Sequence, residues 1–175
     1  KQEMKIAALY GLAEMVGCEF HSHEASTRDV RTETVFQESA IAMSDIEATS
    51  ASLFDKIGKM TPGGQDTLGF LLDILRQPFS EVRIPALMVI KAAASFGYGI
   101  QILFHSTKAK MFRDFLDRHS EMNKQSKEAK YAIIATIANS TKFGLLSEEN
   151  QRFITTAKSR GPFYVPPAMA EPQVI

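Results

Sequence analysis

Apolar residues recur at helical spacing along most of the chain. In the first segment, one predicted face carries Met4, Ala8, Leu9, Leu12, Met15 and Val16. The segment "DTLGFLLDILRQ" has leucines at positions i, i+3, i+4 and i+7, which is the spacing of one face of an α-helix. The sequence has no sustained alternation of apolar and polar residues and no Asn-Gly or Asp-Gly hairpin turn. We therefore predict an all-α protein.

Polar residues at expected helix ends support this prediction. Ser44 and Glu47 have capping-box spacing, in which each side chain can bond to a backbone N–H of the first turn. Ser126 is the predicted N-cap of the helix that contains "KEAKYAIIATIANS". A last helix is expected to follow Ser147 and to end near Gly161, since glycine commonly ends helices.

The last fourteen residues differ in composition from the rest of the chain. Proline fixes φ and lacks a backbone donor, so this segment cannot continue a helix. We predict a helical domain over 1–161 and an extended, Pro-rich tail over 162–175, with prolines at Pro162, Pro166, Pro167 and Pro172.

Three segments share one pattern of apolar, basic and small residues. They are "MKIAALYGL" from Met4, "VRIPALMVI" from Val82 and "AKYAIIATI" from Ala129. The first two start 78 residues apart, close to two units of about 39 residues, which resembles HEAT and armadillo repeats. An intermediate copy is expected near Ile46. We predict a HEAT/armadillo-type α-solenoid of stacked helix pairs, in which neighbouring units bury each other's apolar faces.

The inner surface of such a solenoid is the expected binding surface for a protein partner. It would be built from the second helices of the repeats, here 80–95 and 126–140. The basic position that all three copies share allows a second interpretation, in which its side chains form charge pairs between adjacent repeats. The candidate partner-binding residues are Glu81, Arg83, Met88, Lys91, Lys127 and Lys130.

Composition narrows the possible functions. The chain has 20 Lys and Arg against 20 Asp and Glu, and this zero net charge argues against a nucleic-acid partner. It has no apolar run of about 18 residues, so we expect no membrane span. A single Cys excludes an internal disulfide and fits a reducing compartment. The chain starts in a helical pattern without an initiator Met or a signal-peptide core, so we expect it to be part of a longer protein.

One short stretch, "VGCEFHSHEAS", collects residues that can bind zinc. Cys18, His21, His23 and Glu24 lie within seven residues. A structural zinc site requires four ligands in fixed geometry, and no second ligand pair occurs elsewhere in the sequence. We therefore favour a polar loop between two helices over a metal site. The sequence has no P-loop, GxSxG or HExxH motif, so we expect neither an enzyme nor a cofactor.

The C-terminal segments are similar to one known family. "SKEAKYAIIATIANS" followed by "GPFYV" resembles the C-terminal part of the 26S proteasome non-ATPase regulatory subunit 5 family. The resemblance implies a non-catalytic HEAT-repeat chaperone for assembly of the proteasome base. It also implies binding to the C-terminal domain of one AAA ATPase subunit, which would block premature docking on the core particle. We expect a monomer in the cytoplasm, with the nucleus as a second location. The alternative is another HEAT or armadillo adaptor.

Overall fold

A computed structural model describes residues 2–17, 34–61, 64, 66–117 and 123–164. Within these ranges the chain forms helices and no strand, which confirms the all-α prediction. In chain order the helices are α1 (Gln2–Gly17), α2 (Thr34–Lys59), α3 (Thr67–Leu75), α4 (Ser80–Ala94), α5 (Gly97–His105), α6 (Ala109–Asp117), α7 (Lys124–Asn139), the 3-10 turn η2 (Phe143–Leu145) and α8 (Glu148–Arg160).

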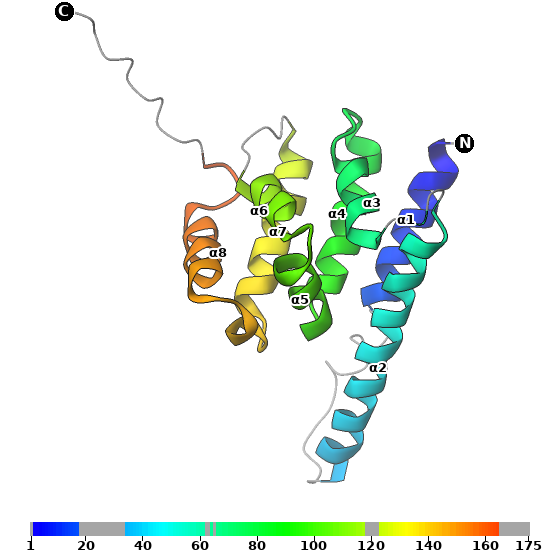
Figure 1. Cartoon of the computed structure of the whole chain (residues 1–175), viewed down its shortest axis with the longest axis vertical. Helices are drawn as coiled ribbons and strands as arrows, with labels where there is room; N and C mark the ends of the chain where they lie inside the picture. The colour runs from blue at the N-terminus through cyan, green and yellow to red at the C-terminus, as the bar shows by residue number, and fades with distance from the viewer. Residues whose placement is uncertain (1, 18–33, 62–63, 65, 118–122, 165–175) are drawn as a thin grey trace, which may run out of the picture.

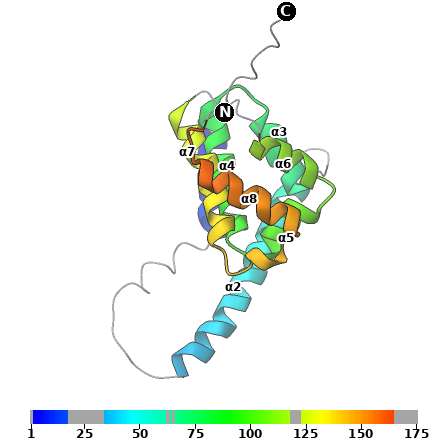
Figure 2. The ribbon, with the colours of Figure 1, turned by 90° about the vertical axis from the view of Figure 1, so that its left-hand side faces the viewer.

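The three helices that carry the shared pattern lie in one row. Helix α1 packs against α4, α4 packs against α7, and α8 follows α7 at the end of the row (Figure 1). Helices α2, α3, α5 and α6 lie beside this row, as the second view also shows (Figure 2). The prediction of an intermediate copy near Ile46 is wrong. Ile46 belongs to α2, and α2 does not lie between the first two copies, because α1 contacts α4 directly.

Helix α4 is the centre of the core because it contacts α1, α2, α3, α5 and α7. It is apolar on nearly all sides, as expected for a helix with several neighbours. Each fully buried Leu, Ile or Val contributes about 1.5–3 kcal/mol through removal of apolar surface from water. The second copy of the pattern is buried at all six predicted positions, namely Val82, Ala86, Leu87, Ile90, Ala93 and Ala94.

The first copy is only partly buried. Leu9 and Val16 lie in the core, but Ala8 is exposed, and Met4 and Met15 are 73% and 47% exposed. The predicted face of α1 is therefore wrong at these three positions. The reason is that α4 and α2 are the main described neighbours of α1, and they cover only part of its circumference.

Two predicted caps are also corrected. Ser44 lies inside α2, because this helix already begins at Thr34. The N-cap of α7 is Asn123, whose side chain accepts a hydrogen bond from the Ser126 backbone N–H at 2.7 Å. The last helix follows the prediction: Ser147 caps α8, and Gly161 ends it with φ 76°.

Helices α4 and α5 meet at a sharp bend of 115°. A Cβ atom at Gly99 would lie 1.9 Å from the Ala93 carbonyl oxygen, so only glycine allows this close approach. In the described ranges no single helix has both the length and the apolar composition to cross a membrane, and only the bent pair α4–α5 meets those criteria when taken together.

Candidate functional site: a basic groove between α6, α7 and α8

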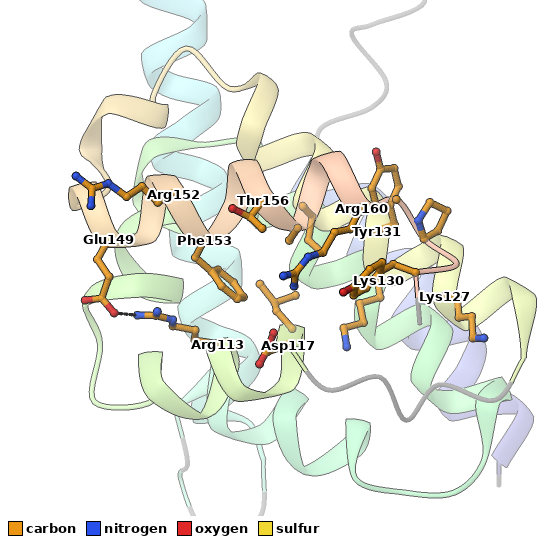
Figure 3. Close-up of a pocket in the computed structure, with 16 residues that line it drawn as sticks. Arg113, Asp117, Lys127, Lys130, Tyr131, Glu149, Arg152, Phe153, Thr156 and Arg160 are labelled. Atoms are coloured by element: carbon orange, nitrogen blue, oxygen red, sulfur yellow. Dashed lines mark hydrogen bonds and ion pairs between the residues drawn. The ribbon is translucent and has the colours of Figure 1, made fainter. Parts of the chain in front are cut away.

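A groove with a volume of about 430 Å³ opens between α6, α7, α8 and the turn that follows α8 (Figure 3). Each helix contributes one aliphatic residue to its lining: Leu116 on α6, Ile134 on α7 and Ala157 on α8. Leu116 and Ile134 are buried members of the main core, so this side of the groove is anchored to the rest of the fold. Charged and aromatic side chains surround these apolar residues.

Helix α8 presents one continuous face to the groove. Its positions follow helical spacing, so they share one side of the helix. The Ser147 hydroxyl accepts a hydrogen bond from the Asn150 N–H, and basic residues in the last turn oppose the negative end of the helix dipole. These local interactions fix the helix that carries Glu149, Arg152, Phe153, Thr156, Ala157 and Arg160.

An ion pair joins α6 to α8 at one end of the groove. The Arg113 guanidinium lies 2.6 Å from the Glu149 carboxylate and 5.1 Å from the centre of the Phe153 ring. Arg113 also donates to the Asn150 side-chain oxygen at 3.4 Å. Partly exposed pairs of this kind contribute about 0–1 kcal/mol to stability. Their main effect here is to orient the Arg113 and Phe153 side chains beside the opening.

Two further cations lie over aromatic rings. The Lys130 ammonium is 4.9 Å from the centre of the Phe115 ring, and Lys130 is only 7% exposed. The Arg160 guanidinium lies 4.7 Å from the centre of the Tyr164 ring, which belongs to the turn after α8. Attraction between a cation and an aromatic face is worth about 0.5–2 kcal/mol, depending on exposure. These contacts favour the positive charges of Lys130 and Arg160 beside the groove.

The groove concentrates positive charge in a chain whose net charge is zero. Its lining contains two carboxylates, Asp117 and Glu149, and the second of these pairs with Arg113. Figure 3 shows Arg113, Glu149 and Arg152 at one end of the groove and Lys127 at the other. Such a site can bind an anionic group next to apolar surface. The five cationic lining residues are Arg113, Lys127, Lys130, Arg152 and Arg160.

The six residues that the sequence predicts for partner binding do not lie together in one site. Lys127 and Lys130 line the basic groove. Arg83 lines a different cavity of about 310 Å³, near Phe115 on α6. Met88 is half-buried against the core, Glu81 is exposed in the first turn of α4, and Lys91 is half-buried in its last turn.

Sequence reasoning missed the contribution of α6 and α8 to this site. Arg113, Arg152 and Arg160 were outside the predicted surface because that surface was limited to the second helices of the repeats. A signal was present in α8, where Arg152, Thr156 and Arg160 are spaced four residues apart and so share one face. The packing of α6 against the same groove depends on tertiary structure and has no local signal.

The zinc-ligand candidates Cys18, His21 and His23, together with Glu24, lie outside the described residues. Within the residues that the structure does describe, no group of three or more His, Cys, Asp or Glu side chains could hold a metal ion.

Comparison with known proteins identifies a family. Residues 33–174 match the family model described as proteasome non-ATPase 26S subunit. The chain is 33% identical over 105 residues to the 26S proteasome non-ATPase regulatory subunit 5 of Bos taurus and, at the same identity and length, to that of Homo sapiens. These matches cover 59% of this chain and 20% of each relative.

The chain therefore spans about a fifth of the length of the curated relatives that it matches. No solved structure gives a significant match. The resemblance to the subunit 5 family is confirmed by these relatives. Because the family model covers most of the chain, this protein belongs to the proteasome non-ATPase 26S subunit family.

Proposed function

We propose that this chain is the C-terminal part of a non-catalytic chaperone that assists assembly of the proteasome regulatory-particle base. It binds the C-terminal domain of one AAA ATPase subunit and obstructs premature docking of that subunit on the core particle. It acts as a monomer in the cytoplasm, with the nucleus as a second location. The observation that carries this proposal is the family match over residues 33–174.

The packing order supports a HEAT/armadillo-type solenoid as the framework of this function. In such repeats each unit contacts mainly its neighbours, and units of two or three helices stack in sequence. Helices α1, α4 and α7 follow this order, and the short helices α5 and α6 precede the longer α7 as a three-helix unit would. A stacked array offers a long platform for a folded domain, which suits binding better than catalysis.

The basic groove is the part of this platform where we place contact with the ATPase subunit. It contains Lys127 and Lys130 from the predicted binding surface, together with the cations of α6 and α8. The segments that carry the family resemblance also line it, through Tyr131 and Tyr164. Glu81, Arg83, Met88 and Lys91 remain predicted contacts, on parts of α4 outside this groove.

A titration of the chain against the isolated C-terminal domain of each proteasomal ATPase tests the proposal. We expect saturable binding to one domain, measured by isothermal titration calorimetry. Binding to none of them, by this chain and by a longer protein that includes it, would contradict the proposal and favour another HEAT or armadillo adaptor. The charge reversal Lys127→Glu should weaken the interaction, whereas Lys5→Glu at the other end of the row should not.

A further inference from the structure

We propose that the groove between α6, α7 and α8 is a binding site for an extended acidic peptide segment of a partner protein, with apolar side chains between the acidic ones. The inference takes from the proposed function only that the chain binds protein. It concerns the chemistry of the bound segment, so it can be tested without an ATPase.

The arrangement of apolar and cationic side chains carries this inference. Tyr131, Phe153 and Ala157 are partly exposed over the buried Leu116 and Ile134, and aliphatic side chains of a ligand can be buried on this apolar surface. Lys127, Arg152 and Arg160 supply positive charge around it, and Arg152 also pairs with the exposed Glu148 carboxylate at 3.4 Å. Arginine and lysine attract carboxylates and can form charge-assisted hydrogen bonds with them. Apolar surface flanked by cations therefore complements a peptide that alternates aliphatic and acidic residues.

The length of the groove favours a peptide over a small anion. Residues 149 to 160 of α8 lie along it, and this distance is about 17 Å at 1.5 Å per residue. An extended peptide rises about 3.3 Å per residue, so about five or six residues would fill the same length. One phosphate or carboxylate group would contact only one end.

The distribution of charge favours an acidic peptide over a nucleic acid. Nucleic-acid binding depends on neutralising many phosphates, which usually requires a marked excess of positive charge. This chain has no net positive charge, and Glu149 and Asp117 interrupt the groove. A short peptide with a few carboxylates can avoid these two positions, whereas a continuous phosphate backbone has less freedom to do so.

The test uses the whole chain and three fluorescein-labelled hexapeptides, followed by fluorescence anisotropy. The probes alternate Leu with Glu, Leu with Gln or Leu with Lys. We expect saturable binding of the Glu peptide, weaker binding of the Gln peptide and none of the Lys peptide. Affinity for the Glu peptide should fall as salt rises, because salt screens exposed charges.

Charge reversal locates the site. The double variant Arg152→Glu/Arg160→Glu should lower affinity for the Glu peptide about tenfold or more, since it replaces two attractions by two repulsions. Arg152→Lys/Arg160→Lys should retain most of the affinity. The matched control is Lys5→Glu/Lys110→Glu, which changes the net charge equally at two exposed first-turn positions outside the groove. Its affinity should stay within about twofold of the original.

Several results would overturn the proposal. These are equal affinity for the three peptides, an equal loss in both charge-reversal variants, and stronger binding of a single-stranded oligonucleotide than of the Glu peptide. Binding that requires removal of residues 165–175 would assign the groove to that segment of the chain and would also overturn it. Thermal unfolding followed by circular dichroism confirms that each variant is folded before its affinity is compared.

Discussion

A Cβ atom at position 99 would lie 1.9 Å from the Ala93 carbonyl oxygen and 2.3 Å from its carbonyl carbon. Gly99 is therefore in close contact with the backbone of the preceding helix, at the bend between α4 and α5. We expect Gly99→Ala to lower the free energy of unfolding by about 1–3 kcal/mol, because the backbone must move to admit the methyl group. Urea denaturation followed by circular dichroism measures this change.

The control for this variant is Gly11→Ala, in the middle of α1. Among the described residues, nothing beyond the backbone of α1 itself lies within 4 Å of a Cβ atom there. Alanine has the higher helix propensity, so Gly11→Ala should raise the free energy of unfolding by up to about 1 kcal/mol. Equal effects of the two substitutions would contradict the importance of the close contact at Gly99.

Glu47 caps a helix to which it does not belong. Its carboxylate, on α2, accepts a hydrogen bond from the Tyr98 backbone N–H at 3.1 Å, in the first turn of α5. The N-cap residue of α5, Phe96, makes no side-chain cap bond. Glu47→Ala should cost about 0.5–2 kcal/mol of stability, since α5 loses a cap and a favourable charge at its N-terminus.

Glu47→Gln keeps an acceptor oxygen and should cost less than Glu47→Ala. Asp45→Ala, at an exposed position of the same helix, is the control and should change stability by at most about 0.5 kcal/mol. A larger loss for Asp45→Ala than for Glu47→Ala, in thermal or urea unfolding, would exclude the proposed cap.

Ser50 connects three helices. Its buried hydroxyl donates to the Val16 carbonyl oxygen in the last turn of α1, at 2.6 Å, and lies 2.7 Å from the Tyr98 hydroxyl on α5. Ser50→Ala should cost about 1–3 kcal/mol, because a buried carbonyl at a helix end loses its donor. Ser52→Ala, on the exposed side of α2, is the matched control. If both changes have the same small effect on the urea midpoint, the connection does not stabilise the fold.

The N-cap of α7 is Asn123, and not Ser126 as the sequence predicted. Asn123→Ala should cost about 0.5–2 kcal/mol because it removes the acceptor for the Ser126 N–H. The buried Ser126 hydroxyl has no hydrogen-bond partner among the described residues. Ser126→Ala should therefore be neutral or stabilising, since it removes an unsatisfied buried polar group. The opposite order of the two effects would support Ser126 as the N-cap.

The helices and the shared pattern could be predicted because both depend on local spacing. The predicted core positions from Val82 are buried, as are Ile133, Ile134 and Ile137 of the third copy, whereas Ala129 is only partly buried. The capping box predicted for Ser44 and Glu47 is wrong because both residues lie inside α2, and Glu47 instead accepts a hydrogen bond from Tyr98 on a distant helix, which local spacing cannot identify. Only part of the groove lining could be predicted. Lys130 was found because it follows the repeat pattern, whereas Arg113 reaches the groove only through the packing of α6.

The position of α8 at the end of the row has a consequence for local stability. Helix α8 packs mainly against α7, whereas α4 contacts five helices. Opening of α8 therefore breaks fewer contacts than opening of α4, and its amide hydrogens should exchange with solvent first. A ligand in the groove would contact α6, α7 and α8 together, so it would slow exchange most strongly in α8. Hydrogen exchange would then show binding at this end as slower exchange in α8, with unchanged exchange rates in the core helix α4.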